Sequence, residues 1–272
     1  MKKLIGLFLL TYGLTSCDKK TEPIVISADD LHQSIQKVAD IMIHDIFSPP
    51  VASRIFANPN IAAYEIMALG NEDYVSFVGK VNELTTIPLP PTDTPINYEL
   101  AAIVAHIELS KRMIFSEKDL VVFRDSLYRK WSGKNPGIFN SSQAYGLKVA
   151  DHIAVWMGKD NYSQTRTMQK FTVDTDDPTR WQPTPPAYMD GIEPHWSKIR
   201  PFVLDSTNQF APVPPPAFSM EKDSEFYREV MEIYDVSKEM ILKGDDSKEM
   251  AMAKFWDCNP YVSVVRGHLM FA

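Results

Sequence analysis

Cysteine is scarce in this sequence, and so are the short motifs that mark common catalytic sites. Only two of the 272 residues are cysteines, Cys17 and Cys258, and they form no Cys-x-x-Cys pair. A Gly-x-Ser-x-Gly turn and a glycine-rich phosphate loop are also absent. Local motifs therefore identify no nucleophile, no phosphate cradle and no redox pair.

Positive charge and glycine are also in short supply. The 28 lysines and arginines are outnumbered by 35 acidic residues, which gives a net charge of −7. Binding to nucleic acid needs a basic surface, so we expect no nucleic acid partner. The 20 prolines outnumber the 11 glycines and gather in two stretches. This pattern indicates linkers or wrapping segments rather than general disorder.

Metal-ligating patterns are weak. No two of the six histidines stand three or four residues apart, the spacing of a helical metal pair, so each is interpreted as structural or exposed: His32, His44, His106, His152, His195 and His268. Asp174, Asp176 and Asp177 resemble the start of a calcium loop. However, Thr179 and Pro185 stand where such a loop needs glycine and glutamate. We predict no metal site.

No apolar run is long enough to cross a bilayer, which takes about 20 residues. The run Leu4–Leu10 follows Lys2 and Lys3 and is therefore typical of a secretory signal. It leads to Leu14-Thr15-Ser16-Cys17. This sequence resembles the bacterial lipobox, which implies cleavage before the cysteine and a diacylglyceryl group on its sulfur.

We therefore expect residues 1–16 to be a lipoprotein signal peptide, Cys17 to be lipidated and residues 17–28 to be a tether. The protein would then be exported and lipid-anchored to a bacterial cell membrane, inner or outer, with that membrane as its partner. An ordinary cleaved signal is the alternative. Acylation of Cys17 would leave no intrachain disulfide, and Cys258 is interpreted as a small buried hydrophobe.

Hydrophobic periodicity predicts an all-α fold, a bundle of about six to eight helices. The N-terminal helices are expected within 29–158, where separate helices are indicated from Asp29 or Asp30 to before Pro49, and over 58–69, 96–115, 117–131 and 141–158. A Pro/Trp-rich segment, 159–220, is expected to lie ordered over them. Further helices are expected within 221–272, over 221–242 and 246–256, and a strand is conceivable only at 261–265.

The C-terminal residues include Leu269, Met270 and Phe271, although natural C-termini are usually polar and exposed. We therefore expect a domain that is cut short, an incomplete half of a larger helical domain. A tail buried as a terminal strand is the alternative.

The aromatic and proline-rich segments carry a resemblance to a known family. In order along the chain they are Trp181-Gln-Pro-Thr-Pro-Pro-Ala-Tyr188, Glu193-Pro-His-Trp-Ser-Lys-Ile-Arg-Pro-Phe-Val-Leu204, Phe210-Ala-Pro-Val-Pro-Pro-Pro-Ala-Phe-Ser219 and Ala253-Lys-Phe-Trp-Asp257. This order resembles the N-terminal half of bacterial vanadium-dependent haloperoxidase-like proteins, in the type 2 phosphatidic acid phosphatase (PAP2) superfamily. The resemblance implies a helical bundle that holds vanadate, or phosphate as a substrate group.

In that family the oxyanion is held by a Lys-x6-Arg-Pro motif, a Ser-Gly-His motif and an Arg…His motif, and this chain lacks them. Lys198 and Arg200-Pro201 have the wrong spacing, and Arg266-Gly267-His268 has no serine. We therefore assign no catalytic, cofactor-binding or metal residue, and vanadate or phosphate is implied only for a full-length member. Arg200 is interpreted as a structural ion-pair or cap residue.

Two functional hypotheses follow. The first is the N-terminal part of a vanadium haloperoxidase/PAP2-like phosphatase-family lipoprotein, inactive as given, which the missing C-terminal half or a second copy would complete. The alternative is a complete, non-enzymatic helical lipoprotein that binds a ligand or a partner protein, with Trp181 and Trp196 stacking on a glycan or peptide. Core packing is the favoured interpretation of both tryptophans. Whether the chain is an enzyme stays open.

Overall fold

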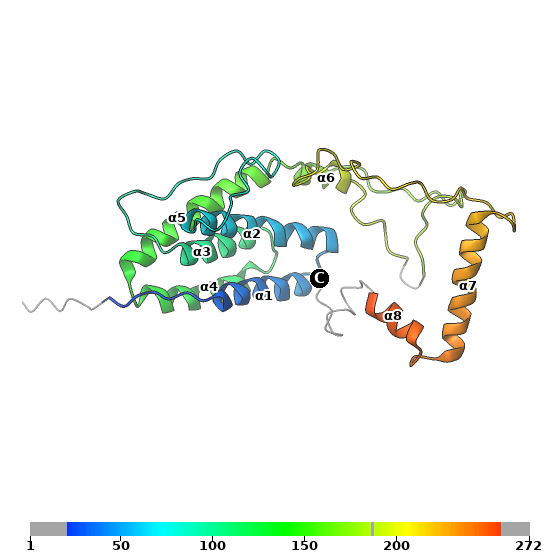
Figure 1. Ribbon diagram of the computed structural model, residues 1–272, viewed down its shortest axis with the longest axis horizontal. Coiled ribbons are helices and arrows are strands. Elements are labelled where there is room, and N and C mark those ends of the chain that lie inside the picture. The colour runs from blue at the N-terminus through cyan, green and yellow to red at the C-terminus, as the bar shows by residue number, and fades with distance from the viewer. Residues whose placement is uncertain (1–20, 186–187, 257–272) are drawn as a thin grey trace, which may run out of the picture.

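The computed structural model describes residues 21–185 and 188–256, and every regular element in this part of the chain is helical (Figure 1). The all-α prediction is confirmed, since the described residues form eight α-helices and one short 3-10 turn. They are α1 (Ala28–His44), α2 (Pro49–Gly70), α3 (Tyr98–Lys111), α4 (Glu117–Ser132), α5 (Pro136–Met157), α6 (Tyr162–Thr165), η1 (Trp196–Lys198), α7 (Glu225–Lys243) and α8 (Lys248–Trp256).

Helix α3 is the centre of a bundle formed by α1–α5 (Figure 1). Every residue from Leu100 to Ser110 is buried, so α3 packs on all sides, chiefly against α2 and α5. A helix that is buried on every side has no face to offer water, which fits this central position. One core cluster joins α3 to α1, α4 and the starts of α2 and α5, and a second joins it to the later parts of α2 and α5.

Helix α2 corrects the expected start at residue 58, because it already begins at Pro49 and contains Pro59. Proline is favoured in the first helical turn, where its missing N–H is not needed. The asparagines that flank Pro59 donate side-chain hydrogen bonds to the carbonyl oxygens of Arg54 and Phe56, at 2.9 Å in each case. The turn that an internal proline weakens therefore gains extra donors.

Helix α5 begins at Pro136, five residues before the expected start at Ser141. The Oδ1 of Asn135 accepts a hydrogen bond from the backbone N–H of Ile138 at 3.1 Å and caps the helix. Pro136 then occupies the first helical position. The glycines and proline at 133–137, which lie between the expected helices 117–131 and 141–158, thus include a helix start.

Local capping signals also proved incomplete. Helix α3 ends at Lys111 rather than at the expected Phe115, whose backbone N–H donates to Asp45 Oδ2 at 2.9 Å. The same carboxylate accepts the backbone N–H of Ser116 at 2.9 Å, and Ser116 makes no side-chain cap. Asp45, which follows the last residue of α1, therefore holds the turn that leads into α4.

The start of α1 needs a smaller correction. The helix begins at Ala28, and Ser27 rather than Asp29 or Asp30 precedes it as the cap. The backbone N–H of Ser27 donates to Asp30 Oδ2 at 2.9 Å, and its hydroxyl donates to the same oxygen at 3.0 Å. Asp30, in the first turn of the helix, therefore accepts both hydrogen bonds that fix the capping residue.

Beyond α5 the described residues form a long connection that contains α6 and η1 before α7 begins. Figure 1 shows α7 and α8 standing apart from the bundle. No residue of either helix is buried among the described residues. Within residues 21–185 and 188–256, none of the helices combines the length and the apolar character that spanning a membrane requires.

Candidate functional site

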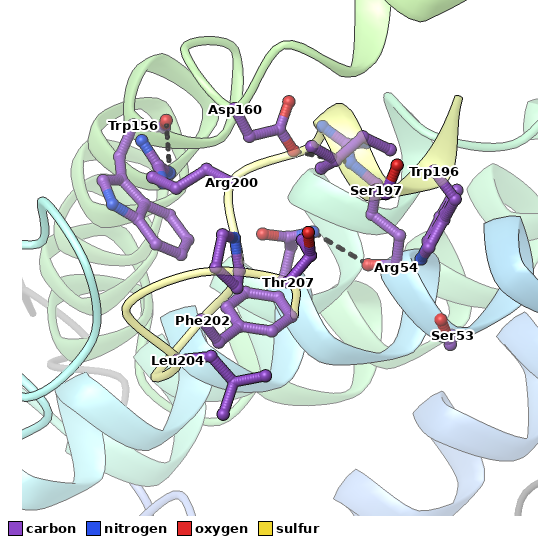
Figure 2. A pocket seen from close by; sticks show the side chains of 13 residues that line it. Ser53, Arg54, Trp156, Asp160, Trp196, Ser197, Arg200, Phe202, Leu204 and Thr207 are labelled. Carbon is purple, nitrogen blue, oxygen red and sulfur yellow. Dashed lines mark hydrogen bonds and ion pairs between the residues drawn. The ribbon is translucent and has the colours of Figure 1, made fainter. Parts of the chain in front are cut away.

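A pocket of about 460 Å³ opens where α2 begins, α5 ends and the segment 196–207 crosses them (Figure 2). Helix α2 contributes Ser53, Arg54 and Asn58 to its lining, and Trp156 comes from the end of α5. The rest of the lining comes mainly from the crossing segment. The volume of the pocket lies within the range of about 300–1,000 Å³ that small-molecule sites occupy.

Asn82 fastens the crossing segment to the bundle. Its backbone N–H donates to the carbonyl oxygen of Phe202 at 2.7 Å, and its side-chain amide donates to that of Leu204 at 2.7 Å. The indole N–H of Trp156 donates to the Asn82 carbonyl at 3.0 Å. One asparagine thus joins the pocket wall on α5 to the segment that covers it.

Arg54 and Asp160 form an ion pair at the pocket. Arg54 Nε lies 2.8 Å from Asp160 Oδ2, and the two side chains are only 10% and 9% exposed. The guanidinium also lies over the ring of Tyr162, 4.2 Å from its centroid. Removal of either partner would leave the other charge buried and uncompensated, so the pair holds α2 against the end of α5.

A second arginine covers the same tyrosine. Arg166 lies 4.6 Å from the Tyr162 ring centroid and pairs with Glu193, whose carboxylate raises the pKa of Arg166. Burial raises the pKa of Tyr162 above its ordinary value, so the phenol stays neutral between two cations. The arrangement is a cation–π stack that anchors the start of the long connection.

Arg200 is structural, as its ion-pair interpretation predicted. Its Nη1 lies 2.6 Å from Glu83 Oε2, and its Nη2 donates to the carbonyl oxygen of Trp156 at 3.1 Å. The guanidinium also stacks over the Trp156 ring, 4.6 Å from the centroid (Figure 2). These contacts use its charge and its flat face to hold the crossing segment.

The residues of this pocket do not fit vanadate or phosphate. Its two lining cations, Arg54 and Arg200, are each already paired with a carboxylate. No histidine of the described chain lines the pocket, although two of the family's three oxyanion motifs contain one. We derive no step that involves an oxyanion here.

Aromatic rings form much of the pocket wall. Figure 2 shows Trp156 and Trp196 on opposite sides, with Phe202 and Leu204 closing another side and Thr207 between them. The rings of Trp156 and Phe202 lie 6.0 Å apart. Trp196 is half-buried and meets Tyr162 edge to face at 6.4 Å. It therefore packs against the bundle and also faces the pocket.

Trp181 departs from the favoured core interpretation. It is 49% exposed and meets Phe171 edge to face at 5.5 Å. Since Trp181 does not line this pocket, the structure does not bring the two candidate stacking tryptophans together.

The histidines of the described chain lie at separate structural positions. His106 is buried, and its Nδ1 lies 2.7 Å from the hydroxyl of Ser34 on α1. Burial lowers the pKa of His106 to about 4, so it is neutral at physiological pH. His152 and His195 contact backbone carbonyl oxygens, while His32 and His44 lie beside Asp29 and Asp45.

No metal centre forms within residues 21–185 and 188–256, where no three His, Cys, Asp or Glu side chains gather closely enough to hold an ion. In the loop that resembled a calcium site, Asp174 accepts the N–H of Asp176, and Asp177 accepts the N–H of Thr179, at 3.1 and 3.0 Å. These local bonds shape turns. Cys17, Cys258, His268 and the conceivable strand at 261–265 lie outside the described residues.

Sequence reasoning found Trp196 and Arg200 in this region but missed Arg54, Asn58 and Asp160. The pocket joins residues more than 100 positions apart, and the ion pair of Arg54 with Asp160 has no local signature. The one available signal, Asn58-Pro59-Asn60, was interpreted as a helix start because proline is common there.

Comparison with known proteins places the chain. No protein-family model matches it, and no curated protein matches it either. One solved structure shares 67% sequence identity and superposes with a TM-score of 0.87, over 90% of this chain and 59% of that one. Together with the all-helical fold, this match defines a class: the chain belongs to the vanadium haloperoxidase-like superfamily, as the proline and tryptophan pattern predicted.

The solved structure is the crystal structure of the first bacterial vanadium-dependent iodoperoxidase. The present chain spans 59% of the length of that protein, so the match covers part of the iodoperoxidase and not all of it.

Proposed function

We propose that this chain forms the N-terminal helical part of a vanadium-dependent haloperoxidase of the iodoperoxidase type. The observation that carries the proposal is the 67% identity to a bacterial vanadium iodoperoxidase over 90% of the chain. The same match favours haloperoxidase over phosphatase chemistry within the superfamily. The chain contributes scaffold, and the vanadate-binding residues belong to the part of that fold it does not span.

The motifs support this division. The chain contains no Ser-Gly-His, and its Lys198 and Arg200-Pro201 lack the spacing of the oxyanion motif. In the described part, Arg200 is committed to Glu83 and to the Trp156 ring. The proposal is tested by vanadate titration of the 272-residue chain, which should show no tight one-to-one complex. A tight complex would overturn it.

Helix α7 supports the need for further structure. It carries large apolar residues that are at least 44% exposed, among them Val230, Ile233, Tyr234, Val236, Ile241 and Leu242. Helices in proteins usually owe most of their stability to packing of an apolar face. We propose that the rest of the fold covers this face of α7.

We further propose that the protein is a bacterial lipoprotein, exported and anchored through lipid on Cys17. The support is the lysine start, the short apolar run and the lipobox-like Leu14-Thr15-Ser16-Cys17. Two acyl chains anchor stably, whereas a single chain binds reversibly.

Metabolic labelling with palmitate tests the anchor. The protein should incorporate label and sediment with membranes, and Cys17→Ser should abolish labelling and release the protein. Cys258→Ser is the matched control, because it removes the only other cysteine and should leave labelling unchanged. Equal labelling of the Cys17→Ser variant would refute the lipoprotein assignment.

A further inference from the structure

Asn58 presents an unused hydrogen-bond acceptor to the pocket between α2, α5 and the segment 196–207. The residue is only 2% exposed and belongs to the pocket lining. Its amide nitrogen donates to the carbonyl oxygen of Arg54 at 2.9 Å, which fixes the orientation of the amide. Within the described chain, no hydrogen bond reaches the other end of the amide, its Oδ1, and this oxygen is not fully enclosed. It is therefore open to the pocket and can accept a hydrogen bond from a ligand.

The pocket around this acceptor is flat-walled and aromatic. Trp156, Trp196 and Phe202 present rings to it (Figure 2). Such faces pack against planar rings in stacked or edge-to-face geometry. At about 460 Å³ the pocket has room for a molecule larger than a single ring. The walls therefore favour a planar, largely apolar ligand.

The charges of the pocket disfavour an anionic ligand. Arg54 pairs with Asp160, and Arg200 pairs with Glu83, so each cation is already neutralised. An anion that paired with Arg54 would leave the buried Asp160 carboxylate without its partner, whereas Glu83 is 65% exposed and would lose less. A neutral ligand requires no such rearrangement.

We propose that this pocket binds a neutral, planar aromatic molecule that carries a hydroxyl group, with the hydroxyl donating to Asn58 Oδ1 and the rings packed between Trp156, Trp196 and Phe202. The exposed hydroxyls of Ser197 and Thr207 lie on the pocket lining and offer further polar contacts to such a ligand. This proposal stands on the geometry of the described chain and does not depend on peroxidase activity.

Calorimetric titration of the full 272-residue chain with 2-naphthol tests the proposal, without vanadate, peroxide or halide present. The comparison ligand is 2-methoxynaphthalene, which has the same rings but no O–H donor. We expect saturable one-to-one binding of 2-naphthol and roughly tenfold weaker binding of the ether, the factor that one neutral hydrogen bond contributes. No saturable binding of 2-naphthol, or equal binding of the two, overturns the proposal.

A matched pair of variants assigns the acceptor. Asn58→Ala should remove the preference for 2-naphthol, whereas Asn60→Ala should keep it. The side-chain amide of Asn60 donates in the same way to the carbonyl oxygen of Phe56, at 2.9 Å, but Asn60 does not line this pocket. Both variants therefore lose a similar helix contact. Loss of the preference in Asn60→Ala alone, or in both variants, would contradict the assignment.

The variant Phe202→Ala tests the same site independently, in case Asn58→Ala fails to fold. Phe202 is 37% exposed, so its truncation should leave the bundle folded. The substitution should weaken the binding of both ligands about tenfold or less, while the preference for the ligand with the hydroxyl persists. Unchanged binding of both ligands by Phe202→Ala would show that they bind elsewhere and would overturn the proposed site.

Discussion

At the scale of single residues, the described chain places several polar groups in its interior and satisfies them specifically. Glu65 is fully buried on α2, and its two oxygens accept the Ser76 hydroxyl and the Phe77 backbone N–H, both at 2.6 Å. The loop after α2 is thereby held to the helix. Such buried contacts specify one arrangement, because a lost partner leaves the other polar group unsatisfied.

His106 makes the stability of the bundle depend on pH. Its pKa is lowered by burial from 6.5 to about 4, so between these values the unfolded chain binds a proton that the folded chain does not. Stability is therefore fully present above about pH 6.5 and is lost as the pH falls toward 4. Between pH 7 and pH 5 the free energy of unfolding should fall by about 2 kcal/mol from this group.

Urea unfolding of the wild type, His106→Gln and His32→Gln at pH 7 and pH 5 measures this contribution. The His106 variant should lose most of the pH dependence, while the variant at exposed His32 should retain it. Equal pH dependence in all three proteins would show that His106 does not carry the effect.

At the scale of elements, the close approach of α5 to α3 depends on Gly146. A Cβ at this position would lie 2.5 Å from the carbonyl oxygen of Ala101 and 2.9 Å from Val104 Cβ. Both contacts involve the buried central helix, which cannot shift without disturbing the two cores it joins.

Gly146→Ala should therefore destabilise the bundle by about 1–3 kcal/mol, despite the better helix propensity of alanine. Gly137→Ala is the control in the same helix, because a Cβ there meets only Asn135 Oδ1 at 3.6 Å, an ordinary contact. It should be neutral or stabilising by up to about 1 kcal/mol. Urea unfolding measures both, and equal effects would contradict the close-packing argument.

The elements also show how far the sequence alone could lead. Periodicity located the helices because a period of 3.6 in apolar residues reflects burial directly. It misplaced the starts of α2 and α5, where proline belongs to the first helical turn rather than to a break. It also missed the hydrogen bond that the Phe115 backbone N–H donates to Asp45, 70 residues away, because contacts distant in sequence leave no local pattern.

The candidate pocket was only partly accessible to the same reasoning. Trp196 and Arg200 were found because they belong to a dense run of aromatic residues and prolines. Asn58 and Asp160 were not, since their roles arise only when α2, α5 and the crossing segment meet. The ion pair of Arg200 was foreseen, but its partner Glu83 was not.

At the scale of the whole molecule, the described chain combines a well-packed bundle with helices that lack a packing partner. The bundle of α1–α5 has two cores of its own, whereas α7 and α8 bury no residue (Figure 1). Since the chain spans 59% of the solved iodoperoxidase, our account assigns the covering of α7 and the binding of vanadate to the remaining part of that fold.

Vanadate titration followed by vanadium-51 NMR tests this account most directly. The titration is made on the 272-residue chain alone and on the chain mixed with the part of the iodoperoxidase that it does not span. We expect the free vanadate signal to persist with the chain alone, and a one-to-one bound signal with iodide oxidation by peroxide in the mixture. Tight one-to-one binding by the chain alone would contradict the central claim that its residues build the scaffold and not the vanadate site.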